Sequence, residues 1–439
     1  MDMTLKDGDQ LEHQAFRSLI PKDIYDLLTQ ISREGFSLTL VGGAVRDYLR
    51  TGELPTDFDF ELRHTFDYDE ADWTFRVNRL GERLREIYRY QVEFLSFSIL
   101  RVSWNQVNYD VELGPARIEK YEQGESFGHS DFKETLVSNA PYEQTFARRD
   151  FTINAMGIEF RTPMTENEFI FVDPYNGIED LKSRSLRPCG ENFAKDPVRF
   201  CRAIRFAKKY DFEYSKELEE AFRTFNLTHL SLFYFLRESF KGDFFAFVDE
   251  FFALSGRHGL HLPEQIEKLS FIKGRGREGL KLSSPEEALQ FFIFGDSDSS
   301  LEEESIRYFC KSAKISISLM DSFKSLYGHL TALRYFSAKD FKAEFKKMNF
   351  HEFLELEGLD ALKAIQKFNS RFGKEKVSFL VRVNSSLYSL YLEVYDLFPA
   401  ALMGKELFEE YLEKEAVKNE ERGLLLLFCH LKVVEKRWS

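Results

Sequence analysis

The pattern of apolar positions divides the chain into a mixed α/β head and a helical remainder. Residues 1–37 are predicted to be a helical lead-in, because four apolar residues recur there at helical spacing: Ile24, Leu27, Leu28 and Ile31. From residue 38 to about 160, β-like runs surround a helix expected near 75–88; these runs are FSLTLV, DFDFEL, FSILRVSW, VNYDVEL and INAMGIEF. After residue 197, Phe- and Leu-rich helical runs alternate with polar breaks such as GDSDSS, and no convincing strand pattern follows.

Length and composition refine this picture into four parts. A chain of 439 residues is long enough for two to four domains, and 46 Phe residues indicate helices packed through large aromatic side chains. The predicted fold class is α+β, with a mixed β-sheet head followed by helices. The predicted boundaries are 1–160 for the head, 161–255 for the neck, 256–336 for the body and 337–439 for the tail.

Charge is distributed unevenly along the chain. The net charge of −13 argues at first against a nucleic-acid partner. Residues 1–160 carry a net −11, however, whereas residues 161–439 carry only −2, and 181–209 form a basic stripe of net +7. A local basic stripe matters more for binding phosphates than the total charge.

Three features favour a cytoplasmic protein. No run approaches the roughly 20 apolar residues of a membrane span. The start, MDMTLKDGDQ, lacks the basic and apolar regions of a signal peptide. The four cysteines are scattered without zinc-type pairing, as expected of reduced thiols.

The segment VGGAVRDYLRTGELPTDFDFE, from Val41 to Glu61, carries the most specific chemistry. A strand ending at Gly42-Gly43 and followed by a helix lets backbone N–H groups approach an anion, and the helix N-terminus favours negative charge. Asp57 and Asp59 are two residues apart, so in a strand both carboxylates lie on one face. Such a pair suits Mg²⁺, which keeps several waters and accepts substrate phosphates. The segment therefore predicts a metal-assisted nucleotide site.

The order of further motifs resembles one family: the class II tRNA nucleotidyltransferases (CCA-adding enzymes) and bacterial poly(A) polymerases. The segment above resembles their catalytic signature, and Arg148-Arg149-Asp150 followed by FTINAMG resembles their ribose motif. Asp173-Pro174 with Gly177 resembles their hinge, and FAKDPVRFCRAIRFA resembles their base-recognition helix. The resemblance covers residues 38 to about 212.

The resemblance implies a role for each matching residue in two-metal nucleotidyl transfer with Mg²⁺. Asp57 and Asp59 bind metal and Glu112 is a third catalytic carboxylate, because the family places it five residues before an arginine, here Arg117; Asp110 remains an alternative. The other implied roles are triphosphate binding by Gly42, Gly43 and Arg46, ribose binding by Arg149 and Asp150, base recognition by Asp196, Arg199 and Arg202, and a hinge at Asp173 and Gly177.

Two departures from the family pattern concern base selection. Relatives usually carry Glu before the motif Asp196, where this chain has Lys195; either base selection is looser, or another acid such as Glu191 substitutes. Relatives often carry an acidic pair before Arg148, where this chain reads EQTFA.

The expected function is addition of CMP and AMP to the tRNA 3′ end, with CTP, ATP and tRNA as partners and no obligate protein partner evident. A basic loop offers candidate RNA contacts at Lys273, Arg275 and Arg277. The alternatives are a poly(A) polymerase, an enzyme adding only CC or only A, and a catalytically silent RNA-binding relative. Poly(A) polymerases tend to carry a basic GRRF-like run where this chain reads QVEFLSFSILRV, which favours tRNA.

Overall fold

The computed structural model describes residues 13–104, 109–121, 128–129, 132–161, 168–295, 303–398, 401–414 and 417–437. The chain divides into two compact units, residues 1–242 with 246–267, and residues 243–245 with 268–439. Residues 256–267, which the sequence assigns to the body, belong to the first unit. The finer division into head, neck, body and tail stays a prediction.

A seven-stranded mixed sheet forms the centre of the first unit, with strand order β3-β4-β5-β2-β1-β8-β9. Its strands are β1 (Ser37–Val41), β2 (Asp57–Arg63), β3 (Gln91–Phe94), β4 (Leu100–Ser103), β5 (Asp110–Pro115), β8 (Gly157–Phe160) and β9 (Phe169–Val172). Within this sheet of the described residues, β2 and β5 pair in parallel and the other neighbouring strands pair antiparallel. Two small sheets pair β6 (Arg117–Lys120) with β7 (Lys133–Leu136) and β10 (Ser185–Leu186) with β11 (Glu213–Tyr214).

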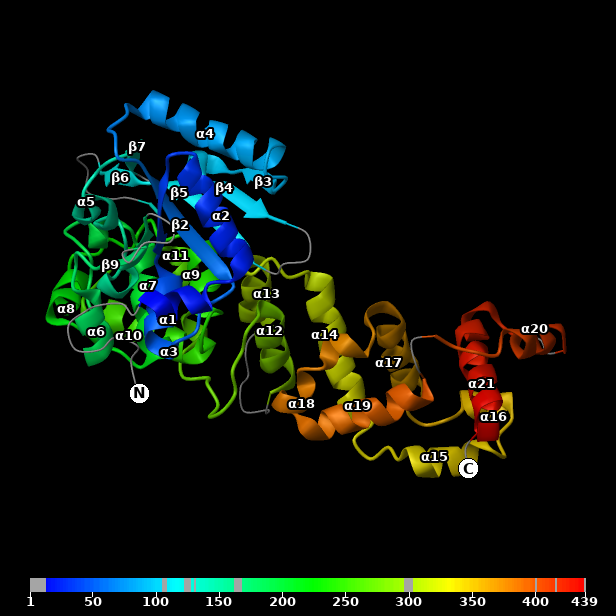
Figure 1. The fold of residues 1–439 in the computed structure, drawn as a ribbon. Helices are drawn as coiled ribbons and strands as arrows, with labels where there is room; N and C mark the ends of the chain where they lie inside the picture. Colours follow the sequence, from blue (N-terminus) through cyan, green and yellow to red (C-terminus); the bar gives the residue numbers. More distant parts are fainter. Residues whose placement is uncertain are drawn as a thin grey trace. The chain divides into compact units, whose positions relative to one another are not determined.

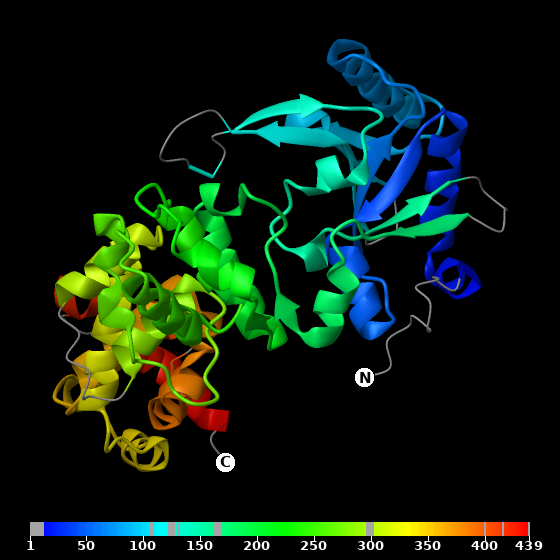
Figure 2. The same cartoon turned by 90° about the vertical axis from the view of Figure 1, so that its left-hand side faces the viewer.

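Helices surround this sheet and continue beyond it. The helices of the first unit are α1 (His13–Leu19), α2 (Lys22–Arg33), α3 (Gly43–Thr51), α4 (Glu70–Glu86), α5 (Tyr142–Phe146), α6 (Gly177–Ser183), α7 (Val198–Tyr210), α8 (Lys216–Phe222), α9 (Leu232–Ser239), most of α10 (Phe244–Arg257) and α11 (Glu264–Glu267). Helices α2 and α3 pack against β1, and α4 packs against β3 (Figure 1). Figure 2 shows α2 and α4, in blue, beside the strands of the sheet.

The second unit is entirely helical within the part of the chain that the structure describes. It contains α12 (Pro285–Phe294), α13 (Glu303–Ser312), α14 (Ile317–Ala332), α15 (Ala338–Phe345), α16 (Phe350–Leu354), α17 (Leu359–Phe372), α18 (Leu380–Val383), α19 (Ser385–Leu397), α20 (Lys405–Lys414) and α21 (Arg422–Val434). Most of the expected GDSDSS break lies outside the described residues.

Aromatic side chains fill the helical core, as the Phe content predicts. Phe200 of α7 contacts Phe222, Phe225 and Phe251 edge-on, with ring centroids 5.3–5.4 Å apart. Rings in this geometry add about 0.5–1.5 kcal/mol per pair beyond their buried area. These ring contacts therefore hold α7, the predicted base-recognition helix, against its neighbours.

The β-rich head and the helical remainder are confirmed, whereas the short edge strands were missed. Strand β3 lies at one edge of the sheet and buries only Val92. Its four residues therefore show almost no alternation of buried and exposed positions. Strand β11 is a two-residue exception to the expectation of no strand after residue 197. Among the described residues, none of the helices is long and apolar enough to cross a membrane.

Candidate active site

The turn after β1 has the geometry that a close approach requires. Gly42 precedes α3 with φ 73° and ψ −130°, in the region that L side chains rarely adopt. A Cβ atom on Gly42 would lie 3.1 Å from Nη1 of Arg149. Glycine at this position thus permits both the backbone conformation and the approach of an arginine to the N-terminus of α3.

The carboxylates lie side by side because β2 and β5 pair in parallel. Asp57 lies opposite Asp110 and Asp59 opposite Glu112, while Phe58 between the two aspartates is buried. Loss of hydration and the charges of Asp57 and Glu112 raise the pKa of Asp59 to about 6. Loss of hydration and the charges of Asp110 and Glu112 likewise raise the pKa of Asp57.

This crowding of negative charge fits a divalent cation. The described residues contain no group of three or more His, Cys, Asp or Glu side chains already arranged to hold an ion. Asp57 and Asp59 would supply two oxygens, and Mg²⁺ commonly takes its other ligands from water and substrate phosphates. The two aspartates are therefore the residues that would hold the metal.

The third carboxylate is engaged by an arginine. Glu112 accepts hydrogen bonds from Nε and Nη2 of Arg101, at 3.2 and 2.7 Å, and Arg101 also lies 3.5 Å from Asp110. Glu112 lines a cavity together with Asp59, whereas Asp110 does not line it. This difference favours Glu112 over Asp110, although the assignment remains a prediction.

A cavity of about 560 Å³ brings the predicted motifs together within the first unit. Its lining includes the residues predicted to contact triphosphate, metal, ribose and base: Gly42, Gly43, Arg46, Asp59, Arg149, Asp150, Asp196, Arg199 and Arg202. A volume of this size falls within the range of small-molecule sites. The cavity can hold one nucleotide between the glycine turn and α7.

Asp150 is the centre of a buried polar network. It accepts hydrogen bonds from Nε of Arg202 at 2.6 Å, Nδ2 of Asn154 at 2.9 Å and the backbone N–H of Phe151 at 2.8 Å. Burial acts to raise the pKa of Asp150, but the Arg202 charge and these hydrogen bonds outweigh it and lower the pKa to about 2. Asp150 is thus a fixed anion paired with Arg202.

The predicted triphosphate residue Arg46 is buried rather than exposed on the surface of α3. It donates to Oδ1 of Asn154 at 2.6 Å and pairs with Asp47 at 2.8 Å, and its guanidinium lies over Phe206 and Tyr210. Arg149 lies beside Gly42, and its charge acts on Asp59. Both arginines line the cavity on the side of the glycine turn.

The base-recognition residues are held by neighbours that differ from the expected acid. Nη2 of Arg199 donates to the backbone carbonyl of Arg148 at 2.6 Å, Nη1 donates to the carbonyl of Asn192 at 3.4 Å, and Asp196 lies 3.8 Å away. Glu191 is exposed. Backbone carbonyls therefore orient Arg199, so Lys195 does not leave it without an anchor.

A buried acid of strand β2, Glu61, lies near Arg148. Oε2 of Glu61 lies 3.8 Å from Nη2 of Arg148, and Oε1 accepts from Nε of Arg63 at 2.9 Å and from Oγ1 of Thr145 at 3.3 Å. Burial and the charges of Arg149 and Arg117 lower the pKa of Arg148 to about 10. Glu61 thus places a buried negative charge near Arg148, in a chain whose segment EQTFA has one acid rather than an acidic pair before Arg148.

The predicted hinge residues, Asp173 and Gly177, lie between the end of β9 and the start of α6. Oδ1 of Asp173 accepts from the N–H of Gly177 at 2.7 Å, and Oδ2 accepts from the N–H of Ile178 at 2.9 Å, so Asp173 caps α6. Gly177 has no positive φ, but a Cβ there would lie 2.2 Å from the carbonyl oxygen of Thr152. Glycine is needed at position 177 because the backbone packs closely there. A hinge role stays a prediction.

Replacing Gly177 by Ala is expected to destabilise the first unit by about 1–3 kcal/mol or more, because the added methyl group meets backbone atoms that cannot rotate away. Chemical denaturation measures the loss. Gly256→Ala in α10 is the matched control, since nothing lies within 4 Å of its Cβ position and Ala is the better helix former. Equal stability of the two variants would contradict the packing argument.

The predicted RNA contacts lie in the second unit. Lys273 is exposed, whereas Arg275 and Arg277 are half-buried and donate to the backbone carbonyls of Phe271 and Val383, at 2.7 and 3.2 Å. Both arginines thus have structural partners. RNA contact by the three residues stays a prediction.

Several residues of the site carried little or no sequence signal. Glu61 continues the alternation of Asp57 and Asp59 on β2, so its face could have been predicted. His129, whose Nδ1 lies 2.9 Å from Oδ2 of Asp196, and Phe97, which lines the cavity, belong to no motif. Only tertiary structure places them.

The family match falls within the first unit of the chain. Residues 38–187 match the family model described as the poly A polymerase head domain. The chain is similar to a multifunctional CCA protein of Mannheimia succiniciproducens, 34% identical over 40% of this chain and 36% of that protein. It is also similar to poly(A) polymerase I of Haemophilus influenzae, 27% identical over 46% of this chain and 41% of that protein. The alignments thus span less than half the length of either curated relative.

A solved structure extends the likeness in fold to the helical part. A Thermotoga maritima CCA-adding enzyme complexed with tRNA-CCA matches 97% of this chain and 98% of its own, with a TM-score of 0.52 and 15% identity. At this identity the match shows the fold alone. It confirms the predicted class, a mixed-sheet nucleotidyltransferase head followed by helices.

Proposed function

We propose that this chain, which matches the poly A polymerase head domain over residues 38–187 and is similar to a multifunctional CCA protein and to a poly(A) polymerase, adds CMP and AMP to the 3′ end of tRNA. The observation that carries the proposal is the single cavity that Gly42, Asp59, Asp150 and Arg199 share. The glycine turn suits phosphates, and the residues at the start of α7 suit a base. The proposal includes Mg²⁺ as the metal and a cytoplasmic location.

The residues divide the work of binding a nucleoside triphosphate. The N–H groups at the start of α3, together with Arg46 and Arg149, bind the triphosphate. A metal held by Asp57 and Asp59 would lower the negative charge at the α-phosphate and favour ionisation of the acceptor hydroxyl. Glu112 lies beside Asp59, where its charge favours removal of that hydroxyl's proton.

Selection of the base rests on α7. Asp196, in extended backbone just before α7, supplies acceptors, and Arg199 in the first turn of α7 supplies a planar fork of donors, so the pair does not share one helical face as the sequence suggests. Cytosine and adenine each present an exocyclic amine beside a ring nitrogen, and both satisfy this pair. Uracil and guanine leave buried groups unpaired, which is costly. Because backbone carbonyls hold Arg199, we expect selection of C and A despite Lys195.

The test uses Mg²⁺, single nucleotides and tRNA ending at the discriminator, at C or at CC. We expect two additions of CMP, then one of AMP, and then no further extension, read on a sequencing gel. Long A tracts would instead identify a poly(A) polymerase, the activity named for the Haemophilus influenzae relative. Addition of CMP alone or AMP alone would identify a partial enzyme. Absence of incorporation on every RNA would favour a silent RNA-binding relative.

A further inference from the structure

The turn between β3 and β4 has a backbone that its residues do not favour. Phe97 has φ 63° and ψ 29°, and Ser98 has φ 54°. The N–H of Ile99 donates to the carbonyl of Ser96 at 3.4 Å, which closes a four-residue turn. Positive φ at both central positions is typical of a type I′ turn, where Asn and Gly are strongly preferred. A bulky side chain at φ > 0 is an outlier that points to function.

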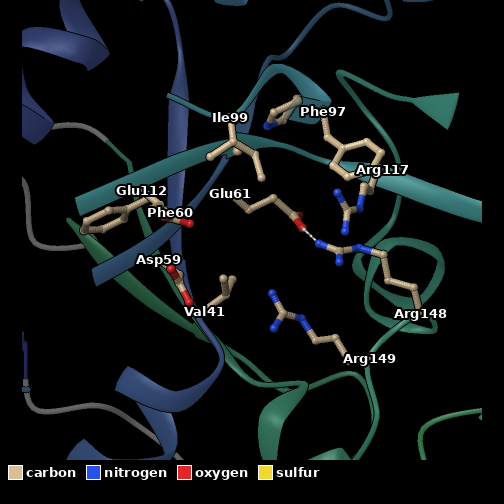
Figure 3. A pocket seen from close by; sticks show the side chains of 12 residues that line it. Val41, Asp59, Phe60, Glu61, Phe97, Ile99, Glu112, Arg117, Arg148 and Arg149 are labelled. Atoms are coloured by element: carbon tan, nitrogen blue, oxygen red, sulfur yellow. Dashed lines mark ion pairs between the residues drawn. The ribbon is translucent and has the colours of Figure 1, made fainter. Parts of the chain in front are cut away.

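The turn presents the Phe97 ring to the active site. The side chain of Phe97 is 50% exposed, although aromatic side chains of this size dominate the core elsewhere. Its ring contacts the guanidinium of Arg117, which lies 5.4 Å from the ring centroid. Phe97 lines the 560 Å³ nucleotide cavity and also a smaller neighbouring cavity of about 210 Å³ (Figure 3).

The smaller cavity adjoins two of the carboxylates, Asp59 and Glu112. Asp59 and Glu112 line it together with Phe97, but neither the glycine turn nor α7 contributes to it. The incoming nucleotide is already accounted for between those two elements. The acceptor hydroxyl has to reach the α-phosphate next to Asp59 and Glu112, so the acceptor end enters beside Phe97. A space of this size suits one terminal nucleoside rather than a whole nucleoside triphosphate.

We propose that Phe97 is the stacking surface for the 3′-terminal base of the RNA acceptor. This inference rests on the proposed function and adds the subsite that holds its second substrate. Stacking on an aromatic ring tolerates every base, because every base has a π-face. The terminal base changes from one addition to the next, so a contact that reads no base edge fits the reaction. The cation–π contact with Arg117 fixes the ring in place.

The test is a double-mutant cycle between Phe97 and the terminal base. Phe97→Gly removes the ring and suits the observed φ, so folding is expected to be preserved. Affinity for 5′-labelled RNA, ending either in a normal nucleotide or in an abasic ribose, is measured by fluorescence anisotropy without nucleoside triphosphates. Removing the terminal base is expected to weaken binding to the wild-type chain by about 10–100-fold, the range of one base–aromatic stack. It is expected to weaken binding to Phe97→Gly less than about 3-fold.

Controls separate stacking from general damage and from loss of the reaction. Phe97→Tyr is expected to restore the effect of the terminal base, and Phe75→Ala, which removes a 69% exposed ring from α4, is expected to leave it unchanged. An equal loss in wild type and Phe97→Gly would overturn the inference, as would a rise in the KM for CTP with an unchanged KM for the acceptor. Because binding is read without catalysis, a wild-type chain that shows the coupling but incorporates nothing would overturn the proposed function alone.

Discussion

Replacing Asp59 by Asn is expected to abolish nucleotide incorporation while raising the thermal stability of the metal-free chain. The carboxylate would bind the metal that assists transfer, and loss of such a contact costs several kcal/mol in the transition state, or at least about 10³-fold in rate. In the absence of metal the same charge is unfavourable, because lost hydration and the neighbouring Asp57 and Glu112 raise the pKa of Asp59 to about 6. Incorporation assays and differential scanning calorimetry measure the two effects.

The response to Mg²⁺ connects these two effects. Mg²⁺ is expected to raise the melting temperature of the wild-type chain, because a ligand that binds only the folded state stabilises it. It is expected to have little effect on Asp59→Asn. Asp67→Asn, which removes an exposed charge shortly after β2, is the matched control for charge and should keep both activity and the Mg²⁺ response. Unchanged incorporation by Asp59→Asn would contradict the metal assignment.

Local sequence is sufficient to place the catalytic half of the site. A run that alternates Asp and Phe has one stable arrangement on a strand, with Phe58 in the core and the aspartates outward. The glycine pair ends β1 as predicted, because φ 73° at Gly42 is readily available only to glycine. These features depend on neighbours within a few residues, so a single sequence reveals them.

The half of the site that is predicted to select the base depends on contacts between residues far apart in the sequence, which no local pattern contains. Arg199 is anchored by the carbonyl of Arg148, 51 residues earlier, and a backbone atom leaves no trace in the sequence. Arg148 has a buried acid nearby in Glu61, which comes from strand β2, far away in the sequence. Phe97 occupies a turn that its residue type argues against. The departures at Lys195 and EQTFA are visible in the sequence. The contacts that hold Arg199 and surround Arg148 arise from tertiary packing, so the sequence does not reveal them.

Replacing Arg202 by Ala is expected to destabilise the first unit by about 3 kcal/mol at pH 7, because it leaves the buried Asp150 charge without its main partner. The linkage between the ionisation of Asp150 and folding gives a free energy of similar magnitude. The Asp150 pKa of about 2 lies below the ordinary value near 3.9, so its ionisation favours the folded state by about 2–3 kcal/mol. Denaturant titrations of the wild-type chain and the variant measure the difference.

The pH dependence distinguishes this loss from a simple packing defect. The contribution of Asp150 is fully present above pH 4 and disappears as the pH falls toward 2, since the folded-state pKa is the lower of the two. The cost of Arg202→Ala should therefore shrink on acidification, whereas the cost of a lost packing contact would not. Arg184→Ala breaks an exposed pair with Asp211 in the same unit and should cost at most about 1 kcal/mol at any pH. A double variant, Asp150→Asn with Arg202→Leu, should regain much of the lost stability, because neither an unpaired charge nor an empty space remains. If it does not, Arg202 stabilises the fold through contacts other than Asp150, and the buried anion is not the centre of the network.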